Sequence, residues 1–147
     1  MSRKLISILP VLMSILFVRG VFAQCEIDNT AFQSGEKITY DLYYKLGVIN
    51  AKAGIGTLNT TTTNLNGKSV YKTQLRANTL GMADNMYSIH DTLTGYMDMK
   101  LVPLLFTKET NEGGDYRTER QSYSYEDGKI TIRVIRYKKG KQAFDET

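Results

Sequence analysis

The chain has 147 residues, a formal net charge of +4, one cysteine and one histidine. This length suffices for one domain with its own core. A single cysteine excludes an internal disulfide, and one cysteine with one histidine excludes a structural zinc site built from four such ligands.

Residues 1–23 show the order of a secretory signal peptide. Arg3 and Lys4 precede an apolar run, and cleavage is predicted after Ala23. A membrane anchor is the alternative, but it would need roughly 20 apolar residues, and Pro10 interrupts this shorter run. The sequence therefore predicts a mature chain of residues 24–147 that is periplasmic or secreted and has no transmembrane segment.

Cys25 raises a second alternative, because a bacterial lipoprotein carries its acylated cysteine directly after a small residue. Here Gln24 occupies that position, and a large polar amide does not suit a pocket built for Gly, Ala or Ser. We therefore favour a free thiol at Cys25 over lipoprotein anchoring through it.

Most of the net charge belongs to the predicted signal peptide. Three of the 19 basic residues and none of the 15 acidic residues lie in residues 1–23, which leaves +1 for the rest of the chain. A surface that follows nucleic-acid phosphates needs a clear basic excess. The most basic stretch, residues 133–141, is typical of a strand and turn with solvated side chains. Nucleic acid is therefore not an expected partner.

Residues 37–46 alternate apolar and polar side chains, which predicts a strand with one buried face. Residues 48–57 form a second strand pattern, and its internal glycines indicate a bulge, a bend or a close backbone approach. Residues 59–68 are predicted as a turn region, since Asn66-Gly67 is a strong hairpin signal.

The middle of the chain gives three further strand patterns and one short segment that reads as a loop or helical turn. The strand patterns are residues 69–79, 86–94 and 96–101, and the short segment is residues 80–85. The second and third of these strands are predicted to pair across a turn at Thr94-Gly95. Pro103 then marks the start of another strand, and residues 111–117 form a turn.

Residues 118–125 and 130–137 form the clearest hairpin, with an Asp127-Gly128 turn. Residues 138–147 follow without a closing element, and we expect further strands beyond Thr147, because an unpaired strand leaves an exposed edge. The predicted fold class is all-β. It is a single curved antiparallel sheet of seven or eight strands, or a half-open β-barrel, after an N-terminal signal helix.

Spaced single residues give the chain a family resemblance over about residues 32–116. The residues that carry it are Phe32, Gly35, Glu36, Lys37, Ile38, Tyr40, Ala53 and Gly54, followed by Asp91, Asp98, Leu101, Pro103, Phe106, Glu112 and Gly113. In this pattern the chain resembles the exported bacterial family called domain of unknown function 3108. The resemblance implies an envelope protein of Gram-negative bacteria with an unassigned role. It also implies a curved antiparallel sheet, similar to the half-barrels of lipoprotein carriers, in chains that continue beyond the equivalent of Thr147.

Catalysis has two candidates. His90 and Asp91 are neighbours, but adjacent strand residues point to opposite faces and cannot form a triad. Asp91 and Asp98 would lie nearly opposite each other if Thr94-Gly95 were a turn, as a glycosidase carboxylate pair requires. No Asp-rich calcium loop surrounds Asp84 or these residues. We expect no catalytic residue, metal or cofactor, and we keep an envelope polysaccharide hydrolase that uses Asp91 and Asp98 as an alternative.

Tyrosines and leucines on the strand patterns are the candidate ligand-binding residues. They are Tyr40, Leu42, Tyr44, Tyr71, Tyr87 and Tyr96. Such side chains commonly build the core of a β domain. In a sheet with no helices to cover it, they can instead line an apolar cavity on the concave face. The leading hypothesis is an exported, non-enzymatic protein that binds a hydrophobic small molecule or an envelope protein there; a structural assembly module is another alternative.

Overall fold

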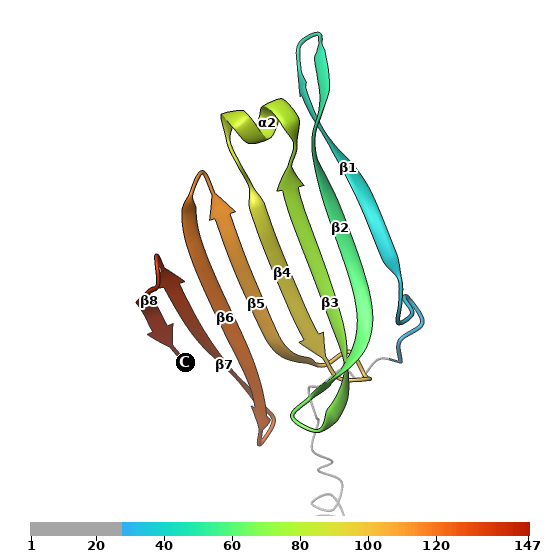
Figure 1. Cartoon of the computed structure of the whole chain (residues 1–147). Helices are drawn as coiled ribbons and strands as arrows, with labels where there is room; N and C mark the ends of the chain where they lie inside the picture. The colour runs from blue at the N-terminus through green and yellow to red at the C-terminus, as the bar shows by residue number, and fades with distance from the viewer. Residues whose placement is uncertain (1–27) are drawn as a thin grey trace, which may run out of the picture.

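The computed structural model describes residues 28–147, so the predicted signal peptide with its helix, and Cys25, lie outside the described residues. Eight strands form one antiparallel sheet in the order of the sequence (Figure 1). They are β1 (Lys37–Leu46), β2 (Ile49–Leu65), β3 (Lys68–Thr79), β4 (His90–Met97), β5 (Pro103–Glu112), β6 (Asp115–Glu126), β7 (Lys129–Lys138) and β8 (Lys141–Glu146). The prediction of a single antiparallel sheet is confirmed, and the sheet does not close into a barrel.

Four hairpins in the described part of the chain turn through two residues that both have positive φ. These pairs are Asn66-Gly67, Gly113-Gly114, Asp127-Gly128 and Lys139-Gly140. Positive φ at both central residues is the geometry of type I′ turns, whose twist matches that of the flanking strands. The turns predicted at Asn66-Gly67 and Asp127-Gly128 are confirmed, and each sets the register of the two strands that it joins.

The predicted boundary between the second strand and the turn that follows it is wrong. β2 continues to Leu65, so the threonines at 60–63 belong to a strand and not to a turn region. Threonine is β-branched and favours extended backbone, which outweighs the turn signal of the flanking asparagines. The glycines of β2 do lie at an irregularity. The pairing register of β1 and β2 shifts between Leu42 and Tyr43, and Ala53 is the extra residue of β2 at this bulge.

The predicted turn at Thr94-Gly95 is also wrong, because both residues lie inside β4. The segment between β3 and β4 contains the short helix α2 (Gly81–Met86), close to the loop or helical turn predicted at residues 80–85. The real turn follows β4, where Asp98 Oδ1 accepts hydrogen bonds from the backbone N–H groups of Lys100 at 2.8 Å and Val102 at 2.9 Å. β5 then begins at Pro103, as predicted.

Residues 138–147 also depart from expectation. Instead of lacking a closing element, they turn at Lys139-Gly140 and pair with β7 as β8. The outer strands of the sheet are therefore β1 and β8.

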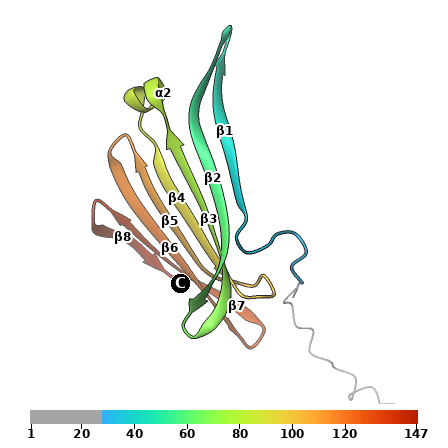
Figure 2. The same cartoon turned by 45° about the vertical axis from the view of Figure 1, so that its right-hand side comes forward.

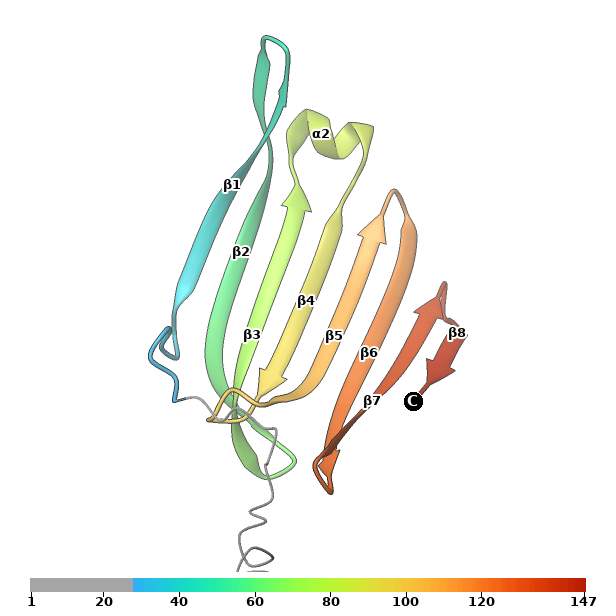
Figure 3. The same ribbon diagram turned by 180° about the vertical axis from the view of Figure 1, so that it is seen from behind.

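The sheet is twisted and bent, and β2 bows most clearly (Figure 2). Seen from the front and from behind, no second layer of described strands or helices covers either side (Figure 3). The segment before β1 is tied to β2, because Gly35 N–H donates to the Thr60 carbonyl at 2.8 Å and Thr62 N–H donates to Ser34 Oγ. Among the described residues, Val70 and Leu105 are the buried apolar side chains.

Candidate functional site: an apolar sheet face with a charged pocket

One face of the sheet collects most of its large apolar side chains. Direct cross-strand partners share a face, and successive residues of a strand alternate between faces. Ile38, Leu58, Leu75 and Leu93 are partners across β1 to β4 and form one apolar row. We call this side of the sheet the apolar face. Its large apolar members include Ile38, Tyr40, Leu42, Tyr44, Leu58, Tyr71, Leu75, Leu93, Met97, Phe106, Tyr123, Tyr125, Ile130, Ile132 and Val134.

The apolar face is open to solvent over much of its area. Ile38 and Leu42 are exposed, as is Tyr40 at 52%, and at the far end of the sheet Ile130 and Ile132 are exposed too. The large apolar side chains of the strands between them, such as Leu58, Leu75 and Leu93, are half-buried. Exposed apolar patches on a protein surface often mark interaction sites. The apolar face therefore has the chemistry of a binding surface for a nonpolar molecule.

The predicted ligand-binding residues divide between the two sides. Tyr40, Leu42, Tyr44 and Tyr71 lie on the apolar face by strand alternation. The Tyr71 ring is already contacted there, edge-on, by the ring of Phe32 at 5.1 Å between centroids.

Tyr96 does not belong with them. It lies on the opposite face, with the Lys72 ammonium 5.9 Å from its ring centroid. Tyr87 follows α2 and lines a pocket instead. Its ring packs so closely on the β5–β6 turn that a Cβ atom added to Gly113 would lie 2.9 Å from the ring.

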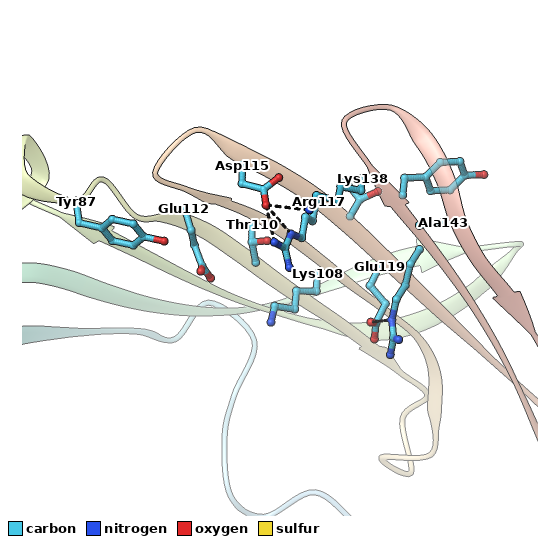
Figure 4. A pocket seen from close by; sticks show the side chains of 12 residues that line it. Tyr87, Lys108, Thr110, Glu112, Asp115, Arg117, Glu119, Lys138 and Ala143 are labelled. Atoms are coloured by element: carbon cyan, nitrogen blue, oxygen red, sulfur yellow. Dashed lines mark hydrogen bonds and ion pairs between the residues drawn. The ribbon is translucent and has the colours of Figure 1, made fainter.

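A pocket of about 430 Å³ lies over β5 to β8 (Figure 4). The pocket lies on the same side of the sheet as the apolar face, because Lys108 is the direct cross-strand partner of Leu93 and Glu119 is the partner of Lys108. Charged side chains dominate its wall. We call it the charged pocket; it is lined by Tyr87, Lys108, Thr110, Glu112, Asp115, Arg117, Thr118, Glu119, Arg136, Tyr137, Lys138 and Ala143.

Asp115 forms one ion-pair cluster in the charged pocket. Its Oδ2 atom accepts hydrogen bonds from Arg117 Nη2 at 2.5 Å and Nε at 3.1 Å, and Lys138 Nζ lies 3.5 Å away. The hydrogen bonds from Arg117, helped by the charges of Arg117 and Lys138, lower the pKa of Asp115. Asp115 Oδ1 is buried and has no hydrogen-bond partner in residues 28–147. Two cations thus share one carboxylate.

Glu119 forms a second cluster, which hydrogen bonds connect to Tyr123 of the apolar face. Burial raises the pKa of Glu119, but hydrogen bonds from Gln121 and Arg136 outweigh this effect and lower it overall. Gln121 in turn accepts a hydrogen bond from the Tyr123 hydroxyl at 2.9 Å. The charge of Lys108 also lowers the pKa of Glu119, yet Lys108 forms no ion pair within the described part of the chain.

The candidate carboxylate pair is not assembled. Asp91 is the second residue of β4 and Asp98 directly follows its last residue, so the two are seven residues or roughly 23 Å apart at the rise of a strand. Asp91 Oδ1 accepts the Asn111 N–H at 3.2 Å, and Asp98 holds its turn. Because a glycosidase needs its carboxyl groups within about 10 Å, this geometry does not provide the pair.

His90 is partly exposed, and its partners differ from those of a triad. Its Nε2 lies 3.2 Å from Asp84 Oδ1, and its Nδ1 lies 3.0 Å from Asn78 Oδ1. Hydrogen bonds from Thr79 and Ser88, with the proximity of His90, lower the pKa of Asp84. The cluster therefore joins α2 to the ends of β3 and β4.

Within residues 28–147, no three His, Cys, Asp or Glu side chains come together as ligands for a metal ion. No helix there has both the length and the apolar character needed to cross a membrane.

Residues 39–147 match the family described as Protein of unknown function (DUF3108). The chain belongs to this family. No curated protein and no solved structure gives a significant match to it. Five of the residues that suggested the DUF3108 resemblance precede the matched region: Phe32, Gly35, Glu36, Lys37 and Ile38.

The resemblance residues within the DUF3108 match have structural roles that the geometry explains. Gly54 lies where an added Cβ would be 2.5 Å from the Asn78 carbonyl oxygen of β3. The Ala53 carbonyl accepts the Leu80 N–H at 2.9 Å. The Pro103 carbonyl accepts the Tyr125 hydroxyl at 2.7 Å. These residues allow β2 and β3 to lie close together and hold neighbouring segments by hydrogen bonds. None of these contacts brings reactive groups together.

Sequence reasoning missed the charged pocket. Lys108, Glu119 and Arg136 come from three strands and meet only through the pairing of β5, β6 and β7. One local signal existed: Arg117, Glu119 and Gln121 alternate along β6 and therefore share a face.

Proposed function

We propose that this DUF3108 protein is exported to the periplasm and binds an apolar, lipid-like molecule on its apolar face. One observation carries the proposal: on one face of an eight-stranded sheet, Ile38, Tyr40 and Leu42 of β1 and Ile130 and Ile132 of β7 are exposed, whereas only Val70 and Leu105 are buried among the apolar residues described. Burial of apolar surface contributes about 25 cal/mol per Å², so a nonpolar ligand would find a strong driving force there. Export is supported by the pattern of residues 1–23.

Native mass spectrometry tests this proposal on the full chain purified from a cell-envelope fraction. We expect an adduct with the mass of an apolar molecule, and we expect delipidation to lower the melting temperature, because a ligand that binds only the folded state stabilises it. Protein that is free of adducts, with a melting temperature that delipidation does not change, would contradict the proposal.

A protein occupant of the apolar face gives a different result. Size-exclusion chromatography of the same preparation would then show a complex with an envelope protein or a second copy of the chain, with no small-molecule adduct. The polysaccharide hydrolase receives no support from the separation of Asp91 and Asp98 along β4.

A further inference from the structure

We infer that the ligand is an amphiphile with an anionic head group, which lies with its tail on the apolar row and its head group at Lys108. This inference rests on the proposed function and names the ligand class of the same face. The decisive feature is a single cross-strand row that changes character between two neighbouring strands. It runs from Ile38 through Leu58, Leu75 and Leu93, and its next member is Lys108.

The row has the dimensions of an extended acyl tail. Neighbouring strands lie about 4.8 Å apart, so the four apolar members from β1 to β4 span roughly 14 Å. Lys108 lies one strand further, at the edge of the charged pocket. A tail that crosses the strands along this row would therefore bring its head group to the Lys108 ammonium.

The charges of the pocket favour an anion. Its wall carries four basic side chains and three acidic ones. Asp115 is shared by Arg117 and Lys138, and Glu119 pairs with Arg136. Lys108 is the cation in this wall without an ion-pair partner in the described residues, and it is exposed. Glu119 lies across from Lys108 but is ion-paired with Arg136, and the third acid, Glu112, is the direct partner of Asp115 and lies near Arg117. An anionic head group would therefore give the Lys108 ammonium an ion-pair partner of its own, whereas a cationic one would be repelled.

The test compares two lysophospholipids with the same acyl chain, below their micelle concentrations. Lysophosphatidylglycerol carries a net negative charge, and lysophosphatidylcholine carries none. Both are titrated against the full mature chain loaded with Nile red, a neutral dye whose fluorescence reports the apolar face. We expect the anionic lipid to displace the dye at about threefold to fivefold lower concentration, the scale of one exposed charge pair. Raising the ionic strength to 0.5 M should remove most of this preference.

Three variants test whether Lys108 causes the preference for the anionic lipid. Lys108→Gln should abolish it, and Lys108→Arg should keep it because the positive charge remains. Lys129→Gln is the matched control: Lys129 is an exposed strand lysine whose side chain lies on the opposite face, so this variant should behave as the unaltered protein does. Equal displacement by the two lipids, or a preference that survives in Lys108→Gln, would overturn the inference and leave the apolar site standing. Failure of Nile red and of both lipids to bind would instead overturn the proposed function itself.

Discussion

Replacing Tyr40 by serine tests whether the apolar face is the binding surface. Tyr40 is 52% exposed, and its direct cross-strand partner is Gly56 of β2, which has no side chain to cover it. A tyrosine side chain presents about 200 Å², so a ligand could cover roughly 100 Å² more of it. At about 25 cal/mol per Å² this is close to 2.5 kcal/mol, and the polar hydroxyl reduces it to about 2 kcal/mol.

We therefore expect Tyr40→Ser to weaken the binding of an apolar probe such as Nile red by up to roughly 30-fold. The chain offers a matched control in Tyr43, which is 61% exposed in the same strand but lies on the opposite face. Tyr43→Ser should leave the affinity unchanged within about twofold, since it removes no surface from the apolar face.

Fluorescence titration of both variants measures the two affinities, and urea unfolding followed by circular dichroism checks that both remain folded. Loss of the half-exposed Tyr40 side chain should lower the free energy of unfolding of Tyr40→Ser by no more than about 1 kcal/mol. Equal weakening in the two variants, or none in Tyr40→Ser, would refute the assignment of binding to the apolar face.

Three further predictions concern stability. Val70→Ala should lower the free energy of unfolding in urea by about 2 kcal/mol, because Val70 is fully buried and each lost methylene equivalent costs about 0.8 kcal/mol before the cavity is counted. Gly113→Ala should destabilise more than Gly114→Ala, since both have positive φ but only Gly113 contacts the Tyr87 ring; urea unfolding should show this difference disappearing in a Tyr87→Ala background. Hydrogen bonds lower the pKa of Asp115 and Glu119 in the folded protein. They contribute stability above the ordinary carboxylate pKa, and this stability is lost as the pH falls through the lowered pKa values. The melting temperature should therefore decline below about pH 4.5, and it should decline less steeply in Glu119→Gln.

The hairpins of this fold could be predicted because their signals are local. Type I′ turns require positive φ at both central residues, and Asn66-Gly67 and Asp127-Gly128 are the residue pairs that adopt it at least cost. Lys139-Gly140 adopts the same geometry with a less favourable first residue, which explains why the last hairpin could not be recognised from the sequence.

Gly95 shows that glycine has two uses in a β protein. Its sequence context predicts a turn, yet Gly95 lies inside β4, where an added Cβ would be 3.1 Å from Thr73 Oγ1. Its partner on β5 is Phe106, a large ring. A small residue beside a crowded neighbour and a small residue at a turn look alike in one sequence, and only the pairing of β3, β4 and β5 separates them.

The charged pocket depends entirely on register. Shifting β5 against β6 by one residue would move Glu119 away from the face that carries Lys108, and the same shift would turn Tyr123 away from the apolar face. No local pattern fixes three registers at once, so the pocket could not be derived without the strand pairing.

The topology explains how so little burial can coexist with an ordered sheet. Every strand pairs with its neighbour in sequence, from β1 to β8, so each new strand adds a full ladder of backbone hydrogen bonds through a short loop closure, which costs little entropy. The apolar face then contributes far less to folding than a closed core would, and its free energy of burial remains available to a ligand. Binding and stability are therefore coupled: a ligand at 100 times its dissociation constant would add about 2.7 kcal/mol to the free energy of unfolding. That gain is comparable to what the fully buried Val70 contributes, so the occupant of the apolar face would act as a part of the core that the described residues do not supply.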